Sequence, residues 1–298
     1  MDRVVLLSLV ETGAGAGCAS PRTAVLACQD ALRGAGVTVD LVTADSDAAI
    51  DAAIQAALDA TSGGTPPAGL IVASAADGQV RAVLRRLVRR YAPAPSRRPA
   101  DLAAHRTVPD LPSIGILSLA PAGSRDTADL VSRLGLPREP DAVAKALLVG
   151  RTRAFDLLRT DAGSVTLDGA LLGGSDQAGR AVRFSARVDV DDVVLSDGRE
   201  PLLAVSVLNA DSYAVVDGLP MVLDPDPTDG RLNVAIAIPV IRGTLRRRVE
   251  VEVRRASGRA VAITPRAEIH LLDDGVAGTL ARKRTWWMEH ACWSAYAP

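Results

Sequence analysis

At 298 residues, with 48% hydrophobic side chains, the chain is long enough to bury two cores of ordinary size, and disorder over its whole length is excluded. Aromatic residues make up only 3%, so those cores must be built mainly from aliphatic side chains. The formal net charge is −1, so no overall field attracts polyanions. We therefore expect no nucleic-acid partner and at most peripheral contact with a membrane.

Cysteine usage and the N-terminal residues predict a cytoplasmic protein. Cys18, Cys28 and Cys292 cannot all pair with one another, and none of them belongs to a Cys-x-x-Cys motif. This pattern is typical of a reducing compartment and gives no support to a zinc site. The apolar run at residues 4–10 is too short for a signal peptide or a membrane span.

The first part of the chain alternates apolar runs with amphipathic stretches. Predicted strands cover residues 4–10, 37–42, 70–72 and 114–119, and predicted helices cover residues 21–33, 45–60, 80–91, 126–134 and 141–148. A glycine-rich turn, Gly13 to Gly17, follows the first strand, and residues 92–110 read as a loop. Alternation of strands and helices predicts parallel βαβ units.

After Gly150 the pattern changes to short strands separated by turn signals. These strands are predicted at residues 151–159, 182–190, 202–208, 232–238, 249–253, 260–263 and 268–272, with a glycine-bearing loop at 163–179. The fold class is therefore α/β plus β: a parallel α/β domain at 1–135 and a mostly antiparallel, sandwich-like β domain at 136–280, with a cleft between them. Residues 281–298 are expected to return to the first domain.

Short motifs occur in a fixed order along this framework. The third strand runs into Ser74-Ala75-Ala76-Asp77-Gly78-Gln79, and the fourth is followed by Pro121-Ala-Gly123-Ser124-Arg-Asp126-Thr127. A helix then leads through Gly150 and a turn to Asp156. The second half contains Val205-Ser-Val-Leu-Asn209, Asp229-Gly230-Arg-Leu-Asn-Val234 and Asp274-Gly275-Val276.

Taken together, these motifs resemble the diacylglycerol kinase catalytic domain, in a group of bacterial lipid kinases that also resembles NAD kinases. Those enzymes carry Gly-Gly-Asp-Gly-Thr, Pro-x-Gly-Thr-x-Asn-Asp and Asp-Gly-Glu at the corresponding places. The resemblance implies an ATP- and Mg²⁺-dependent phosphotransferase that acts on a hydroxyl of a lipid or a small hydrophobic alcohol, with ATP bound between the domains.

The resemblance also implies roles for individual residues. The ATP phosphates are expected against Ala75, Ala76, Gly78 and Gln79 and against Gly123 and Ser124, and Thr43 matches a family threonine that contacts the nucleotide. Asp77 would help to hold Mg²⁺, and Asp274 would accept the proton of the attacking hydroxyl. Three of these residues have a structural alternative: Asp77 as a helix N-cap or turn residue, Thr43 as a helix cap, and Asp274 as part of a hairpin turn.

Several family positions are changed, which leaves a second function open. Ala75 and Ala76 replace two glycines, Gln79 replaces a threonine and Val276 replaces a glutamate. An alanine at positive φ would cost about 1–2 kcal/mol, and its methyl group can obstruct a phosphate cradle. The alternative is a degenerate homologue that no longer phosphorylates lipid and has become an enzyme of specialised metabolism or a binding protein.

Two further groups of side chains bear on partners. Arg85, Arg86, Arg89 and Arg90 form a basic helix face, and residues 246–248 form a second basic patch; each is either a solvated surface or a contact for phosphate or a lipid headgroup. Trp286, Trp287, Trp293 and Tyr296 concentrate aromatic residues near the C-terminus, where they would seal a core or a homodimer interface.

Overall fold

A computed structural model describes residues 1–9, 20–58, 68–103, 106–120, 129–175, 178–242 and 248–298. The chain divides into two compact units. Unit 1 contains most of the first half and the C-terminal residues Cys292–Pro298, and unit 2 consists mainly of Asp156–Ala291. The parallel first half and the antiparallel second half confirm the predicted fold class.

The sheet of unit 1 is parallel. Its strands are β1 (Arg3–Leu9), β2 (Thr38–Ala44), β3 (Gly69–Ser74) and β4 (Ile114–Ser118), in the order β2-β1-β3-β4. The C-terminal end of β18 (Arg284–Tyr296) lies beside β4, with Ala295 opposite Ile114. Every residue of β3 is buried, as expected for a central strand whose two faces are both covered.

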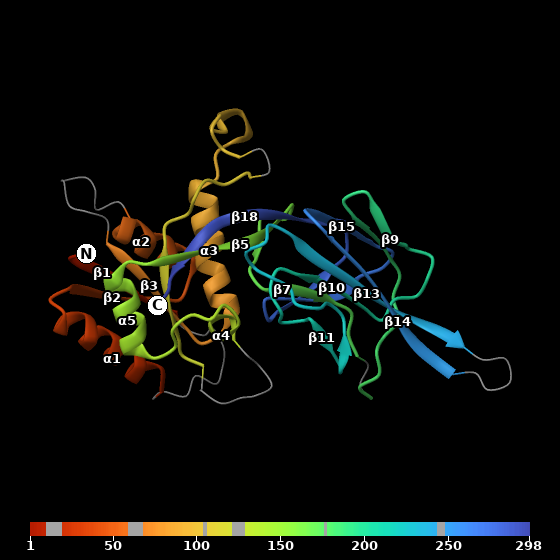
Figure 1. The fold of residues 1–298 in the computed structure, drawn as a ribbon, viewed down its shortest axis with the longest axis horizontal. Coiled ribbons are helices and arrows are strands. Elements are labelled where there is room, and N and C mark those ends of the chain that lie inside the picture. Colours follow the sequence, from red (N-terminus) through yellow and green to blue (C-terminus); the bar gives the residue numbers. More distant parts are fainter. Residues whose placement is uncertain (10–19, 59–67, 104–105, 121–128, 176–177, 243–247) are drawn as a thin grey trace. The chain divides into compact units, whose positions relative to one another are not determined.

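Helices cover both faces of this sheet (Figure 1). Helices α1 (Ser20–Gly34) and α5 (Pro140–Val149) share one core with β1, β2, β3 and β4, whereas α2 (Asp47–Leu58) and α3 (Asp77–Tyr91) contact each other and the sheet. A single helical turn, α4 (Leu130–Arg133), precedes α5. Helix α3 begins at Asp77 rather than at residue 80, so Asp77, Gly78 and Gln79 form its first turn.

Unit 2 is built mainly from strands of two sheets, which enclose a largely aliphatic core. One sheet is antiparallel, with the order β14-β13-β10-β7-β16-β17. Its strands are β7 (Gly169–Leu172), β10 (Ala204–Leu208), β13 (Leu232–Arg242), β14 (Arg248–Gly258), β16 (Ile269–Asp273) and β17 (Val276–Leu280). The other sheet contains β5 (Thr152–Thr160), β6 (Val165–Thr166), β8 (Ala186–Val190), β9 (Val193–Asp197), β15 (Ala260–Pro265) and the first part of β18.

Strand β7 corrects the prediction of a loop at residues 163–179. Its backbone pairs with both β10 and β16, so it lies inside the six-stranded sheet. Gly169, at its start, lies so close to β10 that an added Cβ would come within 2.6 Å of the Leu208 side chain. Four residues that begin with glycine carry too little periodicity to predict a strand, although β7 is central.

The C-terminal aromatic residues fill cores, and the basic face of α3 forms ion pairs. Trp286 is fully buried in the core of unit 2, and Trp293 is buried in unit 1 with its ring 5.0 Å from that of Phe155. Arg85 contacts the Asp47 carboxylate of α2 at 2.8 Å, which accounts for part of the basic face. Within the described part of the chain, no helix has the length and apolar character that crossing a bilayer requires.

Candidate functional site

The turn between β3 and α3 satisfies two of its own backbone donors. The Ala75 N–H donates to Gln79 Oε1 at 2.7 Å, and the Gln79 N–H donates to the Ala76 carbonyl at 3.0 Å. Ala76 has φ −147° and ψ 150°, an extended conformation that any residue adopts, so alanine causes no backbone strain at this position. The amide of Ala75 is therefore engaged by the chain itself.

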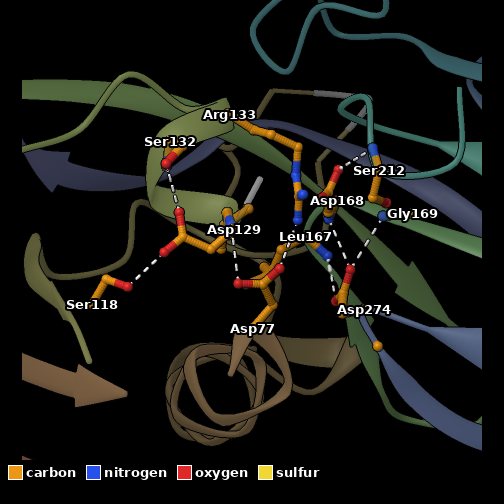
Figure 2. A network of polar contacts seen from close by, with 12 residues as sticks. Asp77, Ser118, Asp129, Ser132, Arg133, Leu167, Asp168, Gly169, Ser212 and Asp274 are labelled. Atoms are coloured by element: carbon orange, nitrogen blue, oxygen red, sulfur yellow. Dashed lines mark hydrogen bonds and ion pairs between the residues drawn. The ribbon is translucent and has the colours of Figure 1, made fainter. Parts of the chain in front are cut away.

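Asp77 is the first residue of α3, and its carboxylate contacts α4. Oδ1 accepts from the Leu130 N–H at 3.0 Å, and Oδ2 accepts from Arg133 Nη2 at 2.6 Å (Figure 2). The side chains of Asp77 and Arg133 are only 22% and 10% exposed. Burial raises the pKa of Asp77, although the Leu130 hydrogen bond and the Arg133 charge oppose that shift. Asp77 is thus not the N-cap of its own helix; it binds the first amide of the next one.

A second carboxylate, Asp129, caps α4. Its Oδ1 accepts from the Ser132 N–H at 3.0 Å, and its Oδ2 accepts from the Ser118 hydroxyl at 2.5 Å (Figure 2). Oδ1 also accepts from Arg138 at 2.6 Å. Burial acts to raise the pKa of Asp129, but these hydrogen bonds outweigh it and the net shift is downward. Our sequence analysis missed Asp129, although Asp at this distance before Ser132 is typical of a helix start.

Of the other residues expected to contact the nucleotide, the structure describes Thr43 but not Gly123 and Ser124. Thr43 is an exposed residue of β2, opposite Ser8 of β1. It does not cap the next helix, because Ser46 Oγ accepts from the Ala49 N–H at 3.3 Å and α2 begins at Asp47. Residues 121–128, which include Gly123 and Ser124, lie outside the described residues, as does the glycine-rich turn at 13–17.

Asp274 occupies the tight turn between β16 and β17, as its structural alternative predicted. Its φ is +47° and that of Gly275 is +76°, the left-handed pair that a two-residue hairpin requires. The buried carboxylate accepts three backbone N–H groups: Leu167 at 2.8 Å, Asp168 at 2.9 Å and Gly169 at 3.1 Å (Figure 2). Asp274 therefore holds the turn between β6 and β7 against the β16–β17 hairpin.

Further buried polar groups surround Asp274. Asp273 accepts from the Thr166 hydroxyl at 2.7 Å, and Asp168 accepts from the Ser212 N–H at 3.1 Å. The Tyr213 hydroxyl accepts from the Gly275 N–H at 3.1 Å. Burial, reinforced by the neighbouring carboxylates, raises the pKa of Tyr213 to about 12, while the Gly275 hydrogen bond opposes that shift. Among the described residues, no three His, Cys, Asp or Glu side chains lie close enough together to hold a metal ion.

Three of the sequence motifs meet at Asp156. Its fully buried carboxylate accepts from the Gly230 N–H at 2.7 Å and the Ala291 N–H at 2.6 Å, and it contacts His290 Nδ1 at 2.8 Å. Asn209 Nδ2 donates to the Asp156 carbonyl at 3.0 Å. Glycine is favoured at position 230, since an added Cβ would come within 3.0 Å of His290 Nδ1 at a φ of +73°. The motif residues around Asp156 thus hold unit 2 together.

The contacts of these residues do not fit the Mg²⁺ and ATP site that the resemblance implied. Magnesium demands oxygen ligands at about 2.0–2.1 Å in near-octahedral geometry. One oxygen of Asp77 contacts a guanidinium and the other contacts a backbone amide, and three amides surround the Asp274 carboxylate. Within the described residues, the candidate phosphate donor at Ala75 also has an internal acceptor.

Solved structures similar to this chain include ones described as diacylglycerol kinases. A diacylglycerol kinase from Bacillus anthracis superposes with a TM-score of 0.63 at 14% identity, over 99% of this chain and 97% of that one. The chain has a diacylglycerol-kinase-like fold. Two structures of a candidate diacylglycerol kinase from the same organism match with TM-scores of 0.66, again at 14% identity and with the same coverage. No family model matches the sequence, and no curated protein matches it either.

Proposed function

We propose that this diacylglycerol-kinase-like protein has lost Mg²⁺- and ATP-dependent phosphoryl transfer and is a binding protein for a lipid or a small hydrophobic alcohol. The observation that carries this proposal is the turn between β3 and α3. There, the Ala75 amide donates to Gln79 and the Asp77 carboxylate is paired with Arg133. The similarity of fold to diacylglycerol kinases supports the class of ligand.

Phosphoryl transfer depends on three kinds of group, and among the described candidates Ala75, Asp77 and Asp274 are each engaged by other groups of the chain. The transferred phosphate needs amide donors, a cation across its oxygens, and a residue that positions or deprotonates the attacking hydroxyl. The Arg133 guanidinium, 2.6 Å from Asp77, takes a position that a cation bound to this carboxylate would need. Three amide donors already bind the Asp274 carboxylate, which supports a role as a structural acceptor rather than a base.

Thermal denaturation with and without millimolar Mg-ATP tests the proposal. A ligand at 100 times its dissociation constant stabilises the native state by about 2.7 kcal/mol, a shift of several degrees, and we expect no such shift. A short-chain diacylglycerol without nucleotide should raise the midpoint. A rise with Mg-ATP in the wild-type protein would contradict the proposal.

A matched variant identifies the cause of the loss. Ala75→Gly, Ala76→Gly and Gln79→Thr together restore the glycine-rich turn and remove the internal acceptor of the Ala75 amide. We expect this triple variant to gain a measurable shift with ATP, because its amides become available to phosphate oxygens. The matched control is Gln55→Thr on α2, which changes the same residue type away from the turn.

The second candidate function is the kinase itself, and the placement of one turn favours it. Asp77 and Gly78 still open a helix directly after a buried parallel strand, and the likeness of fold covers 99% of the chain. In that case the phosphates would lie against Ala75, Ala76, Gly78 and Gln79. Transfer of radiolabelled phosphate from ATP to diacylglycerol by the purified wild-type protein would establish this function and refute the first.

A further inference from the structure

Two carboxylates lie close together at the C-terminal edge of the parallel sheet in unit 1. Asp77 begins α3 shortly after β3, and Asp129 accepts from the hydroxyl of Ser118, the last residue of β4. The N–H of Leu130, which follows Asp129 in the chain, donates to Asp77 Oδ1 at 3.0 Å. Mg²⁺ in proteins takes one or two carboxylates and keeps several waters, and this edge of an α/β sheet is where ligands bind. Asp77 and Asp129 therefore form a carboxylate pair of the kind that suits a divalent cation.

Each carboxylate of this pair already has an arginine. Arg133 Nη2 donates to Asp77 at 2.6 Å, and Arg138 Nη1 donates to Asp129 at 2.6 Å (Figure 2 shows the first of these contacts). The four side chains are mostly buried, with exposed fractions between 10% for Arg133 and 31% for Arg138. Two carboxylates and two guanidinium groups sum to no net charge, so this group of side chains is balanced without a metal ion.

Arg133 takes the more enclosed of the two positions. It is the last residue of α4, and it contacts the carboxylate that follows β3. Arg138 is more exposed and also contacts the Ser132 hydroxyl, so it forms part of the cap of α4. A guanidinium stays charged at every pH at which proteins are folded and, unlike a metal ion, it cannot dissociate from the chain. The positive charge beside Asp77 is therefore permanent.

We propose that the Arg133 guanidinium takes the place of a divalent cation at Asp77, and that removing its charge uncovers a cation site at Asp77 and Asp129. Removal of one partner from a mostly buried ion pair leaves the other charge uncompensated. Without Arg133, the Asp77 carboxylate needs another positive charge, and Asp129 supplies a second oxygen ligand nearby. The inference rests on the proposed function, because it assigns the loss of Mg²⁺ to one residue.

An anion is the alternative ligand for two neighbouring arginines, and the contacts favour it less. Both guanidinium groups bind carboxylates, so a phosphate would have to break two ion pairs before it could bind. The charges of the four described side chains also cancel, which leaves no excess positive charge in this group to attract an anion. The same contacts are what a built-in counter-ion requires.

Thermal unfolding with and without MgCl₂, in the absence of nucleotide, tests the proposal. We expect about 10 mM MgCl₂ to change the midpoint of the wild type by less than about 1 °C, relative to NaCl at equal ionic strength. Arg133→Met should lower the midpoint by about 5 °C or more, and MgCl₂ should restore about 3 °C or more of that loss. Arg133→Gln keeps a donor for Asp77 and removes only the charge, so it replaces Arg133→Met where that variant does not fold.

Three matched variants separate the charge from other effects of the substitution. Arg133→Lys keeps the positive charge, so MgCl₂ should leave its midpoint unchanged. Combining Arg133→Met with Asp77→Asn removes the carboxylate charge but keeps an acceptor for the Leu130 N–H, so the rescue by Mg²⁺ should disappear. Arg86→Met removes an arginine from Asp51, a carboxylate that is 44% exposed and hydrated, and MgCl₂ should not rescue it.

Stabilisation of the wild type by MgCl₂ alone would overturn the proposal, because the cation would then bind while Arg133 is present. A midpoint of Arg133→Met or Arg133→Gln that MgCl₂ does not raise would overturn it too. The proposed function can fail separately. A rise of the wild-type midpoint with Mg-ATP but not with MgCl₂ alone would contradict the proposed function only, because magnesium bound to the nucleotide need not contact Asp77.

Discussion

Asp274→Gly should destabilise unit 2 by about 3–6 kcal/mol, although glycine is the residue that the φ of this turn favours most. The turn conformation alone predicts a neutral or stabilising change, since Asp274 has a φ of +47°. The loss comes from the N–H groups of Leu167, Asp168 and Gly169, which donate to the carboxylate in a buried site. Each buried donor left unsatisfied costs about 1–3 kcal/mol, and entry of water offsets part of the sum.

Two further substitutions at this position separate the hydrogen bonds from the backbone. Asp274→Ala removes the same acceptors and also places a Cβ in the left-handed region, so it should be about 1–2 kcal/mol worse than Asp274→Gly. Asp274→Asn keeps one acceptor oxygen and tolerates positive φ, so it should be the mildest of the three. The expected order of stability is Asn, then Gly, then Ala.

Urea unfolding followed by tryptophan fluorescence measures these differences, because Trp286 is fully buried in the core of unit 2. The matched control is Asp217→Gly. Asp217 and Gly218 form the same kind of turn between β11 (Val215–Val216) and β12 (Leu219–Pro220), with φ values of +50° and +77°. Asp217 is exposed, so its substitution should change stability by less than about 1 kcal/mol. Equal effects of the two glycine substitutions would refute the structural role of Asp274.

Four more predictions concern Asp77, Asp129, Gly230 and Cys28. The stability of the wild type relative to Asp77→Asn should fall as pH rises from the ordinary carboxyl pKa, about 3.9, through the raised pKa of Asp77. The stability of the wild type relative to Asp129→Asn should show the opposite trend. The stabilisation by the Asp129 carboxylate is present above the ordinary carboxyl pKa and is lost as pH falls through the lowered pKa of Asp129. Parallel urea titrations between about pH 3 and pH 7 check the sign of both trends. Gly230→Ala should cost about 1–3 kcal/mol, and less in a His290→Ala background, where only the positive φ remains; a double-mutant cycle measures the coupling. Burial, with a smaller contribution from Asp141, raises the pKa of the Cys28 thiol to about 11, so iodoacetamide at about pH 8 should label it only after unfolding, as peptide mass spectrometry can show.

The parallel half of the fold was predictable because its signals are local. Buried strands read as continuous apolar runs, and the helices between them carry apolar side chains at helical spacing. The antiparallel half was predictable in class but not in detail. Strand β18 was missed because Arg284, Glu289 and His290 interrupt its apolar pattern, and β7 was missed because it is short and begins with glycine.

The residues of the candidate site were predictable only as positions in a motif. Asp77 and Asp274 were both singled out, but their partners lie far away in the sequence: 53 residues separate Asp77 from Leu130, and 107 separate Asp274 from Leu167. The spacing of residues in a sequence does not predict contacts between positions that lie so far apart. The substitution of Gln for Thr at position 79 did carry a readable signal, because a Gln in the first turn of a helix can bond back to the preceding amides.

Internal hydrogen bonding of motif residues occurs in both units, and it bears on how motif order should be interpreted. In unit 1 a side chain of the turn satisfies the Ala75 amide and an arginine satisfies Asp77; in unit 2 three amides satisfy Asp274. A buried donor or acceptor that has no ligand must find an internal partner, because leaving it unsatisfied costs about 1–3 kcal/mol. Once such partners exist, a ligand must displace them before it binds, so each internal bond weakens binding by what it contributes to folding. Under the proposed function, the motif residues keep their places in the fold, and their internal partners are what a phosphate would have to displace.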